Sequence, residues 1–128
     1  MNDCLSVLKS AREAELEVKS MLEQVKLFHG ILNLKGRTRE WAERTVEKIA
    51  ELETELNRQI DEAVDRKREA VRVLSALSGA EKAALYQYYI LARDWSEIAD
   101  ELYFSERQIY NIRKRAVAHL CERYAVVS

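Results

Sequence analysis

The feature that most constrains this chain is the absence of any helix-breaking residue between Arg39 and about Leu77. The whole sequence of 128 residues contains no proline, and its three glycines lie at positions 30, 36 and 79. Proline and glycine are the strongest punctuation between secondary-structure elements, so their scarcity disfavours a many-stranded sandwich or barrel. Alanine, glutamate, lysine, leucine and arginine dominate, as is typical of long helices and coiled coils. We therefore expect an all-α protein.

A first long helix is expected over about residues 3–34. Apolar or small residues recur there at alternating spacings of three and four, which is the pattern of a helix that packs lengthwise on another helix. These residues are Cys4, Val7, Ala11, Ala14, Val18, Met21, Val25, Phe28 and Leu32. Gly36 is expected to end this segment, because glycine adopts the left-handed conformation of helix C-termini without steric cost.

A second long helix is expected from Arg39 to about Leu77, with Thr38 capping its first turn. Lys67 interrupts its apolar side and forms a basic cluster with Arg66 and Arg68. We interpret this cluster as a solvated run, and phosphate contacts are the alternative. The apolar side itself consists of Ile49, Leu52, Leu56, Ile60, Ala63, Ala70, Leu74 and Leu77.

Two arrangements of these long helices are open. They form an antiparallel hairpin within one chain, joined by residues 35–38, or the seams of two chains pair in a dimer. The short connection favours antiparallel neighbours. We expect a coiled-coil-like hairpin over residues 1–77, with homodimer contacts through the same helices, because two helices alone leave apolar surface uncovered.

Residues 78–128 are expected to form a compact domain of three short helices. Each helix start carries a capping box, in which a serine or aspartate is followed three residues later by glutamate or glutamine. The three boxes are Ser78 with Glu81, Asp94 with Glu97, and Ser105 with Gln108.

The last two of these helices have the spacing of a helix-turn-helix motif. Such a motif needs a small residue where the second helix crosses the first, and Ala99 supplies it, ten residues before Ile109. Residues 103–105 supply the tight turn. The predicted core of the motif is Ile98, Ala99, Leu102, Ile109 and Ile112.

Burial of that core leaves a polar face on the last helix. In a major groove, arginine pairs with guanine, and asparagine or glutamine pairs with adenine. Phosphate contacts fix the register without reading sequence. The candidate base readers are Glu106, Arg107, Gln108 and Asn111. The candidate phosphate contacts are Ser105, Tyr110, Lys114 and Arg115.

Charge is distributed unevenly along the C-terminal part of the chain. The whole protein is nearly neutral, with 21 basic and 22 acidic residues and a formal net charge of −1. Residues 79–104, however, carry two basic and five acidic residues, whereas residues 105–124 carry five basic and two acidic ones. This pattern predicts a basic stripe on one helix, which is a weaker nucleic-acid footprint than a wholly basic domain.

The stretch from Leu77 to Leu120 resembles the C-terminal domain of bacterial sigma factors, the domain that binds the promoter −35 element. The residues that carry the likeness are Glu97-Ile98-Ala99, Ser105, Ile109 and Arg115-Ala116. The chain is also similar to small phage-encoded ArpU- and RinA-like activators of late transcription. This resemblance implies that residues 105–114 enter the major groove, and that RNA polymerase is a further partner.

Two positions depart from the sigma-factor pattern. Tyr103 stands where such turns usually have glycine, and a non-glycine residue there implies backbone strain. Residues 1–73 have no counterpart of the domain with which a sigma factor binds core polymerase. A complete sigma factor is therefore not expected.

The leading hypothesis is a sequence-specific regulator of phage or prophage transcription that binds double-stranded DNA. The alternatives are a small terminase-like DNA-packaging subunit and a coiled-coil protein-interaction adaptor. An enzyme is the poorest interpretation, because no nucleophile–base pair, carboxylate dyad or glycine-rich phosphate loop is recognisable. We expect no cofactor.

Composition and motif spacing also bear on location and metals. No apolar run is long enough for a membrane span and no secretion leader is visible, so we expect a cytoplasmic protein of a bacterial host. Cys4 and Cys121 lie at opposite ends of the chain and are expected to be reduced thiols. Two histidines, at positions 29 and 119, give no metal-ligand spacing, so no metal site is expected.

Overall fold

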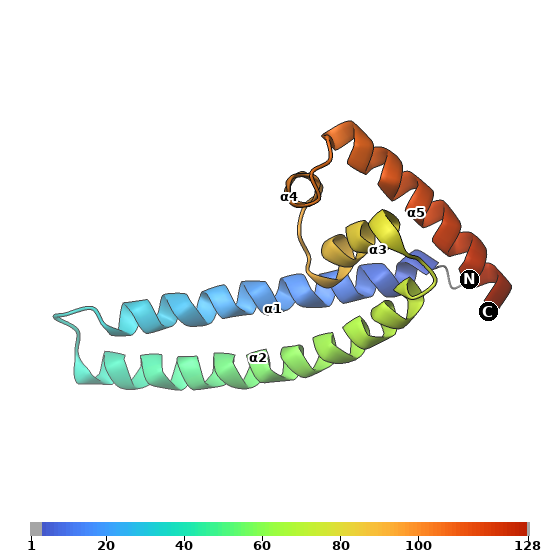
Figure 1. Ribbon diagram of the computed structural model, residues 1–128. Coiled ribbons are helices and arrows are strands. Elements are labelled where there is room, and N and C mark those ends of the chain that lie inside the picture. The colour runs from blue at the N-terminus through green and yellow to red at the C-terminus, as the bar shows by residue number, and fades with distance from the viewer. Residues whose placement is uncertain (1–3, 128) are drawn as a thin grey trace.

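A computed structural model describes the backbone of residues 4–127 and the side chains of residues 5–123. All regular structure in that range is helical, so the all-α prediction is confirmed. Figure 1 shows two long antiparallel helices, with the shorter elements gathered at the end opposite their connection. The elements are α1 (Cys4–Leu32), α2 (Arg39–Leu74), α3 (Gly79–Leu85), the π-helical turn η1 (Tyr86–Ile90), α4 (Trp95–Glu101) and α5 (Glu106–Val127).

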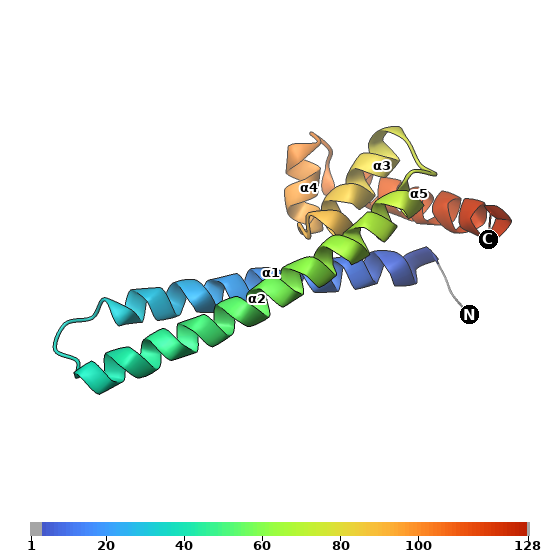
Figure 2. The ribbon, with the colours of Figure 1, turned by 90° about the horizontal axis from the view of Figure 1, so that it is seen from below.

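The hairpin of α1 and α2 forms within one chain. Gly36 in the connection has a φ of +82°, the left-handed conformation expected of it. The Thr38 hydroxyl accepts a hydrogen bond from the backbone N–H of Trp41 and so caps α2. From there α2 continues for 36 residues, which corresponds to about 54 Å. The two helices lie side by side in both Figure 1 and Figure 2.

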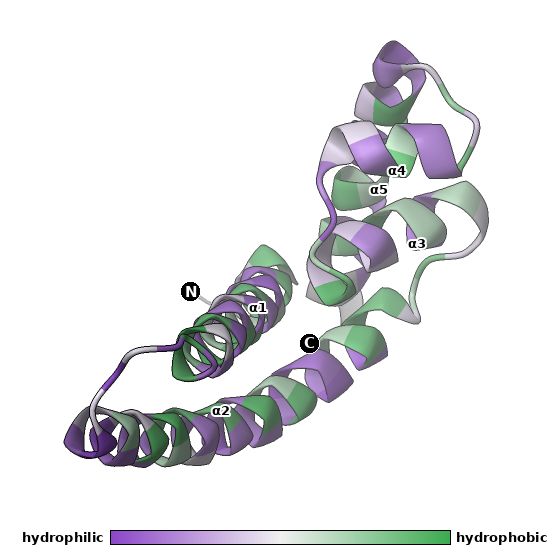
Figure 3. Ribbon diagram, turned by 90° about the vertical axis from the view of Figure 1, so that its left-hand side faces the viewer, coloured by the Kyte–Doolittle hydropathy of each residue, from purple (hydrophilic) through white to green (hydrophobic). Residues whose placement is uncertain are grey.

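Apolar side chains from both helices form the seam of the hairpin, and hydrophobic segments alternate with hydrophilic ones along each helix (Figure 3). One predicted member of the seam is wrong. Ile60 is 39% exposed, whereas Gln59 is partly buried and its Oε1 has no hydrogen-bond partner. The reason is the helical period, since the three-and-four spacing passes from Leu56 through position 59 to Ala63.

Basic residues of α2 interact across the seam instead of forming the expected solvated run. Lys67 pairs with Glu15 of α1, and both side chains are less than one-third exposed. Arg66 donates to the Ser10 hydroxyl of α1 at 2.8 Å. Only Arg68 remains largely in solvent. The lysine that interrupts the apolar stripe of α2 is therefore a cross-helix contact.

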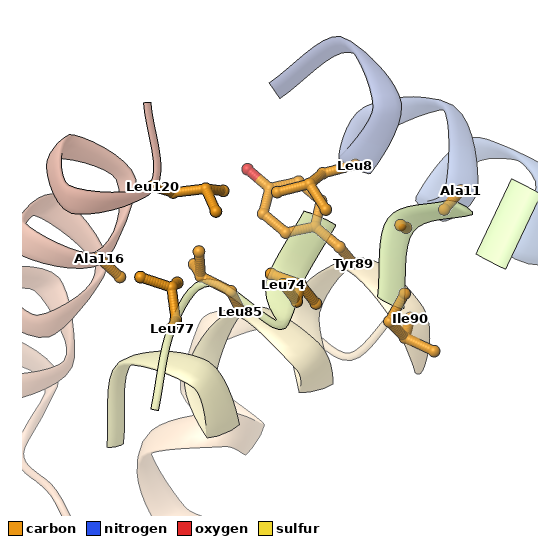
Figure 4. Close-up of a cluster of buried hydrophobic side chains, with 10 residues drawn as sticks. Leu8, Ala11, Leu74, Leu77, Leu85, Tyr89, Ile90, Ala116 and Leu120 are labelled. Atoms are coloured by element: carbon orange, nitrogen blue, oxygen red, sulfur yellow. The ribbon is translucent and has the colours of Figure 1, made fainter. Parts of the chain in front are cut away.

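The largest hydrophobic cluster joins the hairpin to the C-terminal helices (Figure 4). Leu8 of α1, Leu74 of α2 and Leu120 of α5 are fully buried, and the side chain of Leu85 in α3 lies among them. This cluster spans the boundary that the sequence predicts between residues 77 and 78. The base of the hairpin and the C-terminal helices consequently share one core.

Polar contacts reinforce the same junction. The guanidinium of Arg12 in α1 donates to the backbone oxygens of Tyr88, at 2.6 Å, and Arg93, at 3.0 Å. Lys19, two turns further along α1, donates to the oxygen of Leu91 at 2.8 Å. Carbonyl groups at the end of a helix lack intrahelical partners, and cations are favoured there. Side chains of α1 thus bind the end of η1 and the loop that connects it to α4.

The first predicted capping box is not formed. Ser78 has the extended backbone of an N-cap, but its side chain makes no capping hydrogen bond. Glu81, the expected partner, instead lies with its carboxylate 2.8 Å from Nδ1 of His119 in α5. Glu81 therefore forms a tertiary contact with α5 in place of the local capping box with Ser78.

Cys121 is disulfide-bonded, so the expectation of a reduced thiol is wrong for this residue. The side chain of the chain's other cysteine, Cys4, lies outside the described residues. In the part of the chain that the structure describes, no helix is long and apolar enough to cross a membrane.

Replacing Gln59 by leucine is expected to stabilise the hairpin by about 1 kcal/mol, because it removes a buried oxygen without a partner and adds apolar surface to the seam. Urea unfolding followed by circular dichroism measures the change. The control is Gln24→Leu, which makes the same replacement at an exposed site of α1. Equal effects of both variants would contradict the assigned seam.

Replacing Arg12 by alanine is expected to destabilise the protein by about 2–4 kcal/mol, because two hydrogen bonds from a charged group to partly buried carbonyls are lost. Arg12→Lys is expected to lose only part of this stability, because lysine keeps the positive charge. Unfolding equilibria of both variants test the capping contact. A change within 0.5 kcal/mol, roughly that of a neutral surface substitution, would refute it.

Candidate nucleic-acid interface

Helices α4 and α5 pack as a helix-turn-helix pair. The structure brings all five predicted core residues together in one cluster; four of them are buried and Leu102 is partly exposed. Ala99 is 2% exposed, as expected of the small residue at a helix crossing. Ala84 of α3 completes the cluster from behind, so α3 braces the pair.

The turn between α4 and α5 is held by backbone hydrogen bonds. The N–H of Phe104 donates to the oxygen of Ala99 at 2.9 Å. Tyr103 has a φ of +60° and is 94% exposed, so this residue takes the left-handed conformation with no packing in return. The strain that the sequence predicts at this position is therefore present in the backbone.

Capping boxes start both helices of the pair. The Asp94 carboxylate accepts from the Glu97 N–H at 2.9 Å, and this bond lowers the pKa of Asp94. The Ser105 hydroxyl accepts from the Gln108 N–H at 3.1 Å, while Gln108 Oε1 accepts from the Ser105 N–H at 2.8 Å. One acceptor site of the Gln108 oxygen is therefore used in the cap, and its amide nitrogen keeps both hydrogens for other contacts.

The polar face of α5 points away from the core. Arg107, Asn111 and Lys114 are exposed, and their side chains have no hydrogen-bond or ion-pair partner among the described residues. Their spacing of four and three places them on one side of the helix, opposite the buried side. That buried side consists of Ile109, Ile112, Ala116 and Leu120.

The other predicted contact residues flank this face. Arg115 lies beside Gln108 and Asn111 around a shallow hollow of about 210 Å³. Tyr110, which is 59% exposed, lies on the opposite flank with Glu106, around a hollow next to Trp95. All the predicted base readers and phosphate contacts are thus accessible on α5 or at its start.

A stack of rings holds α5 against the preceding elements. The rings of Tyr88 and Trp95 are stacked with centroids 4.3 Å apart. The guanidinium of Arg113 lies 4.9 Å from the Trp95 ring, and that of Arg12 lies 3.8 Å from the Tyr88 ring. Cations over aromatic faces are attracted by the ring quadrupole. Side chains from α1, η1, α4 and α5 are thereby fixed relative to one another.

Sequence reasoning missed three residues of this arrangement. Arg12, Tyr88 and Arg113 are distant in the sequence, and no local motif marks their contact. The π-helical turn η1 was also not foreseen, although a π-turn is frequent near functional sites. Among the side chains of residues 5–123, no group of three or more histidine, cysteine, aspartate or glutamate residues is placed to hold a metal ion.

Fold and surface together define the protein as a helix-turn-helix protein built onto a long helical hairpin. Residues 30–121 match the family described as "Protein of unknown function (DUF1492)". This match covers more than half of the chain, so the chain belongs to the DUF1492 family. No curated protein and no solved structure matches it significantly.

Replacing Tyr103 by glycine is expected to stabilise the protein by about 1 kcal/mol, because a left-handed conformation costs a non-glycine residue about that much and the exposed ring contributes no packing. Tyr103→Ala, which keeps the Cβ, is the control and is expected to bring no gain. Thermal and urea unfolding of the three proteins compare them. Stabilisation by both substitutions would mean that the ring, not the backbone, is the unfavourable element.

Proposed function

We propose that this protein is a sequence-specific regulator of phage or prophage transcription in the bacterial cytoplasm, which binds double-stranded DNA with α5 in the major groove. The observation that carries the proposal is the exposed, unpaired face formed by Arg107, Asn111 and Lys114. Polar side chains that find no partner within the protein are free to bind one outside it. The resemblance of residues 77–120 to the −35-binding domain of sigma factors supports the same use of α5.

The chemistry of the face divides between base and phosphate recognition. The planar guanidinium of Arg107 matches the O6 and N7 acceptors of guanine, and the Asn111 amide matches N6 and N7 of adenine. Lys114 and Arg115 supply charge for phosphates on the flanks. Gln108 Oε1 already accepts a hydrogen bond in the cap of α5 while its Nε2 has no partner among the described residues, so we expect it to contact a base mainly as a donor.

A homodimer through the hairpin is part of the proposal. One side of α2 exposes Val46, Ile60, Val64 and Val71, each between 39% and 52%. Their positions repeat at heptad-compatible spacings along a flank of α2 that adjoins the α1 seam, since Val46, Val64 and Val71 each directly follow a buried seam residue. A symmetric pair of α5 helices favours inverted half-sites about one helical turn, ~34 Å, apart. The sigma-factor likeness supports RNA polymerase as a second partner.

Alanine substitutions are expected to separate the two kinds of DNA contact. Arg107→Ala and Asn111→Ala are each expected to cost about 1–3 kcal/mol on a duplex selected from a random library, and to relax base preference at one position. Lys114→Ala is expected to weaken all duplexes alike. Fluorescence anisotropy with selected and scrambled duplexes measures both effects. A wild-type protein that binds neither duplex at low salt would refute DNA binding, because phosphate attraction is strongest there.

The oligomeric state tests the dimer and the packaging alternative together. The wild-type protein is expected to sediment as a dimer, and the double variant Val64→Glu/Val71→Glu as a monomer, because burying carboxylates in an apolar interface is unfavourable. Ser20→Glu, at an exposed site of α1, is the control. A monomeric wild type would refute the hairpin dimer, and a large ring would favour a small terminase-like subunit.

A further inference from the structure

A groove between the hairpin and the helix-turn-helix pair borders the polar face of α5. Its volume is about 400 Å³. Lys9 lines it from α1, and Arg113 and Lys114 line it from α5, so three cations far apart in the sequence meet at one opening. None of the residues lining the groove is acidic. The groove is therefore positively charged, whereas the chain as a whole is nearly neutral.

The lysines of the groove are available for a ligand. Lys9 and Lys114 are exposed, and within the described part of the chain neither forms an ion pair. Arg113 is held in place by its contact with the Trp95 ring, at 4.9 Å. A guanidinium held in place in the same groove as two unpaired ammonium groups favours an anionic ligand such as a phosphate.

The walls of the groove fit the rest of a nucleic-acid strand. Leu5 and Val117 contribute apolar surface, and Tyr110 contributes a phenol ring that is 59% exposed. Deoxyribose presents apolar edges between successive phosphates, so cations alternating with apolar surface match a sugar–phosphate chain.

The position of the groove links it to the face that reads bases. Tyr110 and Lys114 belong both to the groove and to the proposed phosphate contacts of α5. Lys114 also shares one side of α5 with Arg107 and Asn111. A strand that leaves the recognition face on the side of α1 therefore passes the mouth of the groove.

We infer that this groove binds the DNA backbone flanking the bases read by α5, and that Lys9 of the hairpin supplies one of its phosphate contacts. The inference rests on the proposed function and extends the DNA-binding surface beyond the helix-turn-helix pair to α1. An acidic protein segment is the competing occupant, and the experiment below distinguishes it.

The test compares Lys9→Ala with wild-type full-length protein on a duplex selected from a random library, over a series of salt concentrations. Loss of one phosphate contact is expected to weaken binding roughly threefold to tenfold near 0.1 M salt, and to reduce the salt slope by about 0.9. Base preference is expected to stay unchanged. Ethylation interference is expected to lose a phosphate at the edge of the site. Lys26→Ala, an exposed lysine of α1 outside the groove, is the matched control.

The other outcomes are separable. If Lys9→Ala binds like Lys26→Ala while Lys114→Ala is weakened, the inference is wrong and the proposed function stands. If the wild-type protein binds no duplex, both fail. If Lys9→Ala loses affinity for an oligoglutamate peptide but not for DNA, the groove takes an acidic protein segment and the inference is overturned. Circular dichroism checks that the variants remain folded, as expected for an exposed lysine.

Discussion

The arrangement of this protein depends on how α1 holds the end of the α3–η1 segment. Arg12 and Lys19 donate to three backbone oxygens there, at Tyr88, Leu91 and Arg93. The same guanidinium of Arg12 lies 3.8 Å from the Tyr88 ring, which in turn stacks on Trp95 at the start of α4. Tyr88 and Leu91 lie at the end of η1, where carbonyls lack intrahelical partners, and Arg93 lies in the loop that leads into α4. One helix of the hairpin thereby fixes the segment that leads from η1 into α4.

The consequence for function is that the hairpin and the helix-turn-helix pair are not independent. Leu8 and Ala11 of α1 are fully buried in the same cluster as Ala116 and Leu120 of α5. Buried clusters of this kind transmit displacement because packed side chains do not deform freely. A partner that moved the hairpin would therefore also move the helix proposed to enter DNA. Through this coupling the long N-terminal helices position α5, in addition to the proposed pairing of two chains.

Much of the fold could be predicted because its signals are local. The three-and-four spacing, Gly36, Thr38 and the capping boxes at Asp94 and Ser105 each depend on residues close in sequence, and the structure contains all of them. Two of the failures share a cause. Glu81 bonds to His119 instead of capping at Ser78, and Lys67 pairs with Glu15 across the seam. In both cases the side chain binds a residue that is distant in the sequence, whereas the local sequence pattern predicted a cap for Glu81 and solvent for Lys67.

Some residues of the candidate site could likewise be predicted from local signals, and others could not. The exposed positions on α5 follow from helical periodicity once Ala99 and Ile109 are placed at the crossing. The contributions of Arg12, Tyr88 and Lys9 do not, because they depend on how α1 crosses the C-terminal helices. No spacing rule connects residue 9 with residue 114. Such contacts are visible only once the tertiary packing is known.

The central claim is that the outward side of α5 contacts DNA. Residue-resolved NMR of the amide groups, recorded while a duplex is added at low salt, tests it most directly. The account predicts that the largest shifts fall within residues 103–115 and in the first turns of α1, with the far end of the hairpin near Gly36 unaffected. Shifts confined to the exposed side of α2, or none at all, would contradict it.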